Sequence, residues 1–281
     1  MTDIHSSISV IIPVYNRCTL INRAIKSVIE QTIPPDEIIV IDDGSTDGTG
    51  NIVKNRYPDV ILLKQKNRGV SCARNNGINI AKGTWLALLD SDDEWLPEKL
   101  EKQLLGLRND SNKKICHTDE IWIRNGVRVN PMNKHRKYGG NIYKYCLPLC
   151  VISPSSIIIH KEIFKNVGLF DEDLPVCEDY DFWLRICSRY PVLYLQEKLI
   201  KKYGGHDDQL SRQYWGMDRF RIRALEKMIN DPVLSENDRM ATVTTLINKA
   251  RILHKGLVKH NHEEEAKKMT KKLTELETLY D

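Results

Sequence analysis

Short apolar runs alternate with amphipathic segments over the first hundred residues of the chain. The runs have the length of buried strands, and the segments between them have the 3.6-residue spacing of helices. The predicted strands are 9–14, 37–41, 60–64 and 85–89, and the predicted helices are 20–31, 45–57 and 70–81. This β-α alternation predicts an α/β fold with a mostly parallel, twisted sheet and helices on both faces.

The pattern is less regular beyond residue 110. Apolar runs predict strands at 115–117, 121–129 and 157–160, a helix at 178–190 and a short apolar segment at 192–195. After Gly204-Gly205 the composition changes to charged segments with helical spacing, at 214–230, 236–257 and 262–279. We therefore predict a sheet domain over 1–210 and a helical extension over 211–281, which packs on the domain or forms a homo-oligomer contact.

Polar side chains follow four consecutive strands of the predicted sheet. The clusters are Tyr15-Asn16-Arg17, Asp42-Asp43-Gly44, Asn67-Arg68-Gly69 and Asp90 to Asp93. Ligands of such sheets bind at the carboxyl ends of the strands. Turn formation alone explains Asn, Asp and Gly at these places, but it does not explain so many carboxylates on one edge.

The stretch Leu88-Leu89-Asp90-Ser91-Asp92-Asp93 is the most informative part of the chain. An apolar run stops at three carboxylates within four positions. Such carboxylates repel one another and are costly unless a cation or several donors hold them. A hard divalent metal would satisfy them and would also neutralise a diphosphate. The alternative is a solvated acidic turn before a helix at Pro97, and the triplet alone leaves both interpretations open.

Size and charge restrict the class of protein. The chain has 281 residues, of which 41% are hydrophobic, enough for one large domain with an appendage or two small domains. With 42 basic and 38 acidic residues the net charge is +4, which does not suggest a nucleic-acid binder. The basic clusters at 134–137, 198–202 and 267–272 indicate solvated faces, with weak attraction to an anionic membrane as the alternative.

The 7 cysteines indicate the compartment. Their number is odd and no C-x-x-C pair occurs, which favours reduced thiols in a cytosol over a disulfide framework or a zinc site. Residues 1–8 contain no apolar signal-peptide core, and no apolar run has the length of a membrane span. We therefore expect a cytoplasmic protein, with peripheral contact at the inner face of the membrane left open.

Five motifs occur in order along the chain. They are V-I-I-P-V-Y-N at 10–16, I-V-I-D-D-G-S-T-D-G-T at 39–49, N-R-G-V-S-C-A-R-N-N-G at 67–77, L-L-D-S-D-D-E-W at 88–95 and C-E-D-Y-D-F-W-L-R at 177–185. Together they resemble the family 2 glycosyltransferases, which have the GT-A fold and transfer sugars from nucleotide donors. The resemblance covers about residues 8–210. It implies a nucleotide-binding part at 8–110 and an acceptor and catalytic part at 111–210.

The resemblance also implies roles at the matching positions. The nucleotide would contact Pro13, Tyr15, Asn16, Asp42, Asp43, Arg68, Arg74, Asp90 and Ser91. Asp92 and Asp90 would hold Mg²⁺ or Mn²⁺, which suit carboxylate and diphosphate ligands. His206 would complete the metal shell or touch the diphosphate, and a loop histidine without a ligand is the alternative. Asp93 and Trp95 would face the donor sugar or the acceptor.

Glu178-Asp179 is a second informative pair, at the start of a predicted helix. Asp179 and Asp181 are two residues apart and do not share a helix face, so one can point at the site while the other has a structural role. In the family the Asp of such a pair is the general base, which implies Asp179 with Glu178 beside it. Ordinary acidity at a helix start, favoured by the macrodipole, is the alternative.

The resemblance implies an inverting, metal-dependent transferase. A sugar would pass from a nucleoside diphosphate, UDP by default, to a hydroxyl of a glycan or glycolipid in envelope polysaccharide or lipopolysaccharide synthesis. The alternative is a non-catalytic sugar-nucleotide-binding or scaffolding module of the same fold. A sugar-1-phosphate nucleotidyltransferase is disfavoured because no glycine occurs in Tyr15-Asn16-Arg17-Cys18, and a Rossmann dehydrogenase is disfavoured because no G-x-G-x-x-G follows the first strand.

Overall fold

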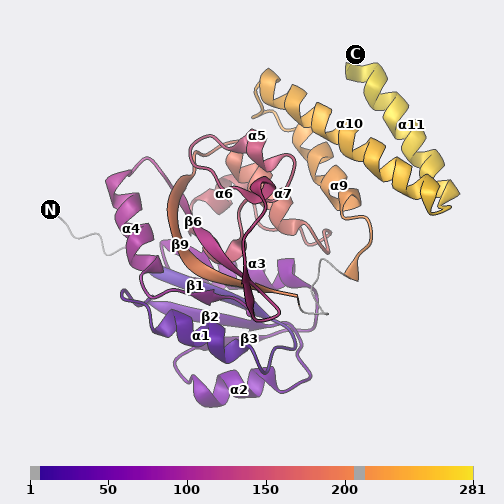
Figure 1. The fold of residues 1–281 in the computed structure, drawn as a ribbon. Helices are drawn as coiled ribbons and strands as arrows, with labels where there is room; N and C mark the ends of the chain where they lie inside the picture. The colour runs from indigo at the N-terminus through magenta and orange to yellow at the C-terminus, as the bar shows by residue number, and fades with distance from the viewer. Residues whose placement is uncertain (1–6, 206–212, 281) are drawn as a thin grey trace.

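One twisted sheet runs through the main domain of the computed structural model, which describes residues 7–205 and 213–280 (Figure 1). Its strand order is β3-β2-β1-β4-β8-β6-β9-β5, and β7 pairs with β6 off this path. The strands are β1 Ile8–Val14, β2 Glu37–Asp42, β3 Ile61–Lys64, β4 Trp85–Leu88, β5 Glu94–Trp95, β6 Ile115–Arg124, β7 Val127–Val129, β8 Ile158–His160 and β9 Leu193–Gly204.

Parallel pairing dominates the first half of the sheet. β1 pairs in parallel with β2 and β4, and β2 pairs in parallel with β3. Beyond β4 the pairing is mixed, because β8 runs antiparallel to both β4 and β6 while β6 and β9 are parallel. The predicted α/β sheet with flanking helices is confirmed, and its parallel part places four strand ends at one edge.

Helices cover both faces of the sheet. They are α1 Ile21–Ile29, α2 Thr49–Arg56, α3 Val70–Ile80, α4 Lys99–Asn109, α5 Tyr143–Cys146, α6 Ile163–Val167, α7 Glu178–Cys187, α9 Asp218–Ile229, α10 Glu236–Lys259 and α11 Glu263–Tyr280, with 3-10 turns η1 Asn133–His135 and η2 Pro154–Ser156. Side chains alternate along β1: Val10 packs in the core with Ile25 of α1, and Ile11 packs in the opposite core with Ala73 of α3. Both faces of β1 are therefore apolar.

The predicted single strand at 121–129 is wrong. Asn125 and Gly126 have φ angles of 49° and 77°, the backbone of a two-residue hairpin turn. β6 runs up to Arg124, the chain reverses, and β7 pairs back with Arg124 opposite Val127. An Asn-Gly pair between apolar positions is a hairpin signal, which the apolar pattern alone did not separate from a strand.

The short apolar segment predicted at 192–195 is the beginning of the 12-residue strand β9. The exposed polar residues at 196–198 hide the strand in the sequence. β9 continues beside β6 through register shifts around Asp119, and its last residues reach the edge where β1, β2 and β4 end. The strand thereby carries Lys202 and Tyr203 to that edge.

The predicted helical extension is present as α9, α10 and α11 and projects from the domain (Figure 1). α9 packs on α7, α10 packs on α9 and α5, and α11 packs on α10. Leu225 of α9 and Leu246 of α10 belong to the same apolar core as Leu184 of α7. The Tyr143 hydroxyl and the Thr242 hydroxyl are 2.7 Å apart and join α5 to α10. In the described residues, no helix has the length and apolar character of a membrane span.

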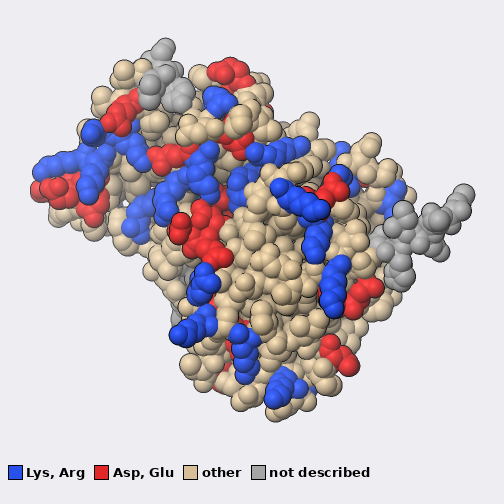
Figure 2. All heavy atoms as spheres, turned by 180° about the vertical axis from the view of Figure 1, so that it is seen from behind, with Lys and Arg blue, Asp and Glu red and all other residues tan. Residues whose placement is uncertain are grey.

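Charged side chains of both signs are intermixed over the helical extension, as Figure 2 shows from behind. The basic cluster at 267–272 belongs to this mixed surface, since Lys267 pairs with Glu264 and Lys272 pairs with Glu226. The cluster is a solvated face with its own counter-charges, which agrees with its interpretation from the sequence.

Candidate active site

A cavity of about 890 Å³ opens where β1, β2 and β4 end. This volume lies in the range of ligand pockets. Residues predicted to contact the nucleotide line it: Pro13, Tyr15, Asn16, Asp43, Arg68, Arg74, Asp90 and Ser91. Asp92, Asp93, Glu178 and Asp179 line the same cavity. The two acidic motifs, far apart in sequence, therefore meet at one site.

Hydrogen bonds between side chains and backbone brace the first three loops of the cavity. Asn16 has a φ of 50°, and its Oδ1 accepts from the backbone N–H of Thr46 at 2.8 Å. Asp43 accepts from the backbone N–H groups of Arg68 and Gly69, each at 2.9 Å. These bonds fix the loops relative to one another before any ligand binds.

Asp42 is buried and does not line the cavity, which corrects its predicted contact with the nucleotide. Its Oδ1 accepts from the backbone N–H of Ser45 at 2.9 Å. A Cβ added to Gly50 would lie 2.4 Å from Asp42 Oδ2, so α2 begins packed against this carboxylate. Neighbouring strand residues point to opposite faces, and only Asp43 of the pair faces the cavity.

The acidic turn after β4 is satisfied largely by protein donors. Asp93 is buried; its Oδ2 accepts from the Ser155 hydroxyl at 2.6 Å and its Oδ1 from the backbone N–H of Tyr203 at 2.9 Å. Burial, and then the charges of Asp92 and Asp90, raise the pKa of Asp93 well above its usual range. Asp93 thus anchors β9 and η2 to the turn, and it lines the cavity together with Asp92, so its contact with the donor sugar or the acceptor stays a prediction.

The Arg74 guanidinium joins the two acidic motifs. Its Nη2 donates to Asp90 Oδ1 and its Nη1 to Glu178 Oε1, both at 2.7 Å. Burial works against the charge of Arg74, but Asp90 and Glu178 raise its pKa, so the guanidinium remains charged. Burial and the adjacent Asp179 charge raise the pKa of Glu178 to about 7, against the lowering effect of Arg74.

Asp179 lies at the start of α7, half-buried on the cavity wall. Its Oδ1 accepts from the backbone N–H of Tyr180 at 2.7 Å, and its Oδ2 accepts from the Cys150 thiol at 3.2 Å. Within residues 7–205 and 213–280, no ion pair joins it to a basic side chain. The carboxylate is therefore oriented by neutral donors.

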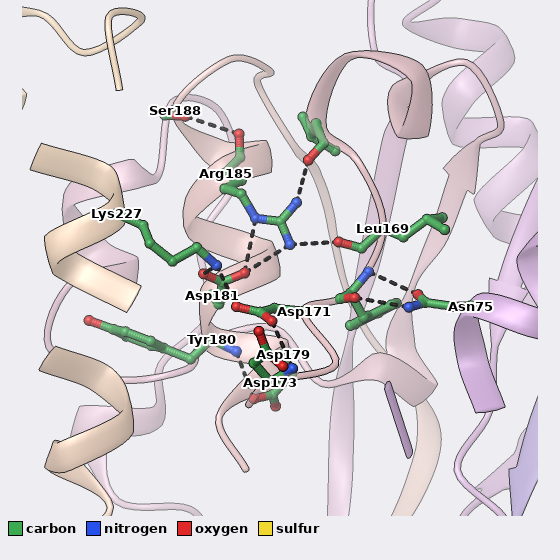
Figure 3. A network of polar contacts seen from close by, with 12 residues as sticks. Asn75, Leu169, Asp171, Asp173, Asp179, Tyr180, Asp181, Arg185, Ser188 and Lys227 are labelled. Atoms are coloured by element: carbon green, nitrogen blue, oxygen red, sulfur yellow. Dashed lines mark hydrogen bonds and ion pairs between the residues drawn. The ribbon is translucent and has the colours of Figure 1, made fainter. Parts of the chain in front are cut away.

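Asp181 has the structural role that its position on the helix allows. It is fully buried and lies between Arg185 and Lys227 (Figure 3). Arg185 Nε donates to its Oδ2 at 2.9 Å, and Lys227 of α9 donates to its Oδ1. Just beyond the end of α7, Arg189 pairs at 2.5 Å with Asp231, which follows α9. The helical extension thus holds the helix that carries Asp179.

A family model described as glycosyl transferase family 2 matches residues 9–168, more than half of the chain. The chain belongs to glycosyl transferase family 2. TuaG of Bacillus subtilis, a glycosyltransferase named for teichuronic acid biosynthesis, is 40% identical over 221 residues, which are 76% of this chain and 85% of TuaG. WfaP of Escherichia coli, a UDP-Glc:alpha-D-GlcNAc-diphosphoundecaprenol beta-1,3-glucosyltransferase, is 32% identical over 188 residues, 65% of this chain and 70% of WfaP.

Other relatives are longer than the matched region. An uncharacterized glycosyltransferase of Rickettsia typhi is 32% identical over 207 residues, which are 72% of this chain and 65% of that protein, and for a Rickettsia bellii relative the chain covers 32%. Among solved structures, S. aureus TarS 1-349 in complex with UDP-GlcNAc has a TM-score of 0.72 and 21% identity, covering 85% of this chain and 71% of that one. At this identity the likeness shows the fold alone, and that fold is the predicted GT-A fold.

The cavity of this family 2 chain suits a divalent cation that arrives with a diphosphate. Among the described residues, no three His, Cys, Asp or Glu side chains form a metal cluster of their own. Mg²⁺ usually takes one or two carboxylates and completes its shell with waters and substrate phosphates. Asp92 and Asp90, both on the cavity wall, fit that arrangement. His206 lies outside the described residues.

Trp95 does not form a wall of the family 2 site, which corrects its predicted role. It is buried in the core on the α1 face, and its indole N–H donates to the Ser155 carbonyl at 2.7 Å. The Lys99 ammonium lies 3.9 Å from the centre of the indole ring. Trp95 was assigned to the site because it closely follows the acidic turn in the sequence, but its place in β5 directs its side chain into the core.

Several residues that line the family 2 cavity escaped the sequence-based prediction. Lys202 of β9 faces it and donates to the Ser153 hydroxyl at 2.9 Å. Burial disfavours the Lys202 charge, but Glu120 and Asp93 raise its pKa, so it adds a fixed cation beside the acidic turn. Tyr214 and Met217, from the helical extension, also line the cavity. The length of β9, hidden by polar residues, was the missing signal for Lys202.

Proposed function

We propose that the chain transfers a sugar from a nucleoside diphosphate to a hydroxyl of a glycan or glycolipid, with inversion at the anomeric carbon. The observation that carries this proposal is the Arg74 bridge between Asp90 and Glu178. Because one guanidinium contacts both, the two carboxylates lie within about 8 Å of each other. This contact supports a donor end and a base end that belong to one and the same cavity.

Residues of the strand ends would hold the donor. Tyr15, Asn16 and Arg68 present polar groups on the cavity wall, and Asp43 keeps the Arg68 loop in place. Asp92 and Asp90 would hold Mg²⁺ or Mn²⁺ together with the diphosphate, and the cation would supply Lewis-acid stabilisation of the leaving phosphate. Lys202 adds positive charge on the same wall. The donor end would thus stabilise the negative charge of the diphosphate.

Asp179 would act on the acceptor. It takes the proton of the acceptor hydroxyl while the hydroxyl oxygen bonds to the anomeric carbon and the carbon–phosphate oxygen bond breaks. A single displacement of this kind inverts the anomeric centre and needs no nucleophile from the protein. The non-catalytic alternative is not favoured, because Asp90, Asp92 and Asp179 are all retained on one cavity wall.

The relatives support the substrate classes of the proposal. WfaP is named for UDP-Glc and a diphosphoundecaprenol-linked acceptor, TuaG for teichuronic acid biosynthesis, and TarS was solved with UDP-GlcNAc. We therefore propose a UDP-sugar donor and an acceptor in envelope polysaccharide or lipopolysaccharide synthesis. Acceptors of this class would be met at the inner face of the membrane. A cytoplasmic location and peripheral contact with that membrane therefore stay predictions. A homo-oligomer through the helical extension stays a prediction as well.

The test begins with a screen of UDP-, GDP- and dTDP-sugars for thermal stabilisation and for hydrolysis in the presence of Mn²⁺. With the best donor, Asp179→Asn is expected to preserve donor affinity and to reduce turnover by about 10² or more, because the base is lost. Asp92→Ala is expected to weaken metal-dependent donor binding in calorimetric titration. The exposed Asp59→Asn serves as the matched control.

Two results would contradict the proposal. Near-normal turnover of Asp179→Asn would exclude Asp179 as the base. Donor affinity that shows the same metal dependence in Asp92→Ala and in the unmodified protein would exclude the metal role of Asp92.

A further inference from the structure

Cys150 lies behind the cavity wall, beside Asp179. Its Sγ is 3.2 Å from Asp179 Oδ2 and 3.2 Å from the carbonyl oxygen of Ile152. A thiol has a single proton, so Cys150 donates to only one of these two acceptors at a time. The side chain is partly buried, and the mechanism proposed above gives it no task.

The thiol stays protonated at neutral pH. Burial, and then the neighbouring Asp179 charge, raise the pKa of Cys150 well above its usual range, and Lys202 opposes the shift. A protonated, enclosed thiol is neither a nucleophile nor a metal ligand. What remains for Cys150 is hydrogen bonding, as a weak donor through S–H and a weak acceptor through sulfur.

Cys150 is the side-chain donor to Asp179 among the described residues, since the other hydrogen bond to this carboxylate comes from the backbone N–H of Tyr180. Other titratable groups lie around the pair: Glu178 and Tyr180 of α7, Cys177 before it, Cys146 of α5 and Lys202 of β9. Within the described part of the chain, none of these five side chains makes a hydrogen bond to the Asp179 carboxylate. The Cys150 bond therefore sets the orientation of Oδ2.

We propose that Cys150 is a positioning residue that holds the Asp179 carboxyl group in both of its protonation states. This inference rests on the proposed function. Before transfer, the S–H group donates to the ionised carboxylate. Once Asp179 has taken the acceptor proton, its O–H donates to Sγ and the S–H group turns to the Ile152 carbonyl. The acceptor O–H bond breaks and the Asp179 O–H bond forms, while Cys150 keeps its own proton throughout.

The weakness of the thiol bond matters for the base. A hydroxyl at this place would form a shorter and stronger bond to the ionised carboxylate, which would hold Asp179 in its charged form and lower its basicity. A residue without a donor would leave the carboxylate less stabilised and therefore more basic. Serine and alanine at position 150 are thus expected to change the pH dependence of turnover in opposite directions.

The experiment measures kcat against pH with saturating donor for the unmodified protein, Cys150→Ala and Cys150→Ser. The acidic limb reports the base in the substrate complex. It is expected to rise by about half to one pH unit in Cys150→Ala and to fall by a similar amount in Cys150→Ser, with KM for the donor unchanged. Cys187→Ala changes a buried cysteine of α7, the helix that carries Asp179, away from the cavity, and should give the unmodified profile.

A second measurement does not depend on turnover. The infrared S–H stretching band of Cys150, assigned by its loss in Cys150→Ala, is expected to shift in Asp179→Asn, where the acceptor changes from a carboxylate to an amide. A band at the same frequency, or acidic limbs that superimpose in all variants, would overturn the role of Cys150. If Asp179→Asn instead keeps its turnover, the base assignment itself fails, which separates the two proposals.

Discussion

Two acidic clusters line the cavity, and their negative charges are stabilised in different ways. Asp90 to Asp93 crowd into a turn after β4, where burial and mutual repulsion raise the pKa of Asp93 and hydrogen bonds from Ser155 and Tyr203 hold it. Glu178 to Asp181 begin a helix, which spreads them around its axis. Asp179 faces the cavity while Asp181 is buried between Arg185 and Lys227.

This comparison teaches how a fold separates acids for chemistry from acids for structure. In the turn, the separation depends on donors brought from β9 and η2. In the helix, it follows from the rotation of about 100° between successive residues. Arg74 connects the two clusters, because its buried guanidinium pairs with Asp90 of the turn and with Glu178 of the helix.

The largest expected effect comes from removing that shared cation. Arg74→Met leaves Glu178 buried opposite Asp90 without a counter-charge, and the free energy of unfolding is expected to fall by about 3–5 kcal/mol. Urea unfolding measures it, and turnover should be lost as well. The matched control is Arg68→Met, which breaks an exposed pair with Glu172 and should cost about 1 kcal/mol or less. Equal costs for the two variants would show that Arg74 does not bridge the clusters.

A smaller effect distinguishes the two aspartates of the helix. Asp181→Asn weakens the buried contacts to Arg185 and Lys227 and is expected to lower the free energy of unfolding by about 2–3 kcal/mol, while the folded protein keeps its turnover. Asp179→Asn should show the reverse, with stability kept and turnover lost. Thermal unfolding and initial rates on the same samples measure both. If Asp181→Asn loses turnover without losing stability, the roles are assigned to the wrong residues.

A third prediction concerns pH. The pKa of Glu178 rises from its ordinary 4.5 to about 7 in the folded chain, mainly through burial and then through the Asp179 charge. Between these values the folded state binds more protons than the unfolded state, so the stability that Glu178 contributes is complete below about pH 4.5 and is lost as pH rises through about 7. The difference in unfolding free energy between the unmodified protein and Glu178→Gln should therefore decline from pH 4.5 to 7. A difference independent of pH would contradict this.

The sequence predicted the parallel part of the fold because β1 to β4 and their helices have regular spacing and short turns. The strand ends of a parallel sheet also predicted that Asp43 and Asp92 share one edge, and the family resemblance implied that Asp179 joins them; all three line the cavity. The sequence-based prediction was wrong where a residue was assigned to the site only because it adjoins site residues along the chain. Asp42 and Trp95 adjoin such residues, but their side chains are buried away from the cavity.

Contacts between distant segments were beyond the reach of local pattern. The two partners of Arg74 lie 16 and 104 residues away along the chain, so no spacing rule indicates the bridge. Lys202 lies on β9, a strand that the sequence did not predict because its middle residues are polar, and its hydrogen-bond partner Ser153 comes from a separate loop. These contacts could be identified only from the three-dimensional structure.

α7 is held at its start through Glu178 and Arg74 and in its middle through Asp181 and Lys227, and the turn that follows it is held through Arg189 and Asp231. The orientational entropy of Asp179 is therefore already lost when the chain folds. In the transfer proposed above, an acceptor would therefore not have to spend binding energy on ordering Asp179. Even a weakly held acceptor would then react fast, and the product would leave soon after the bond is made.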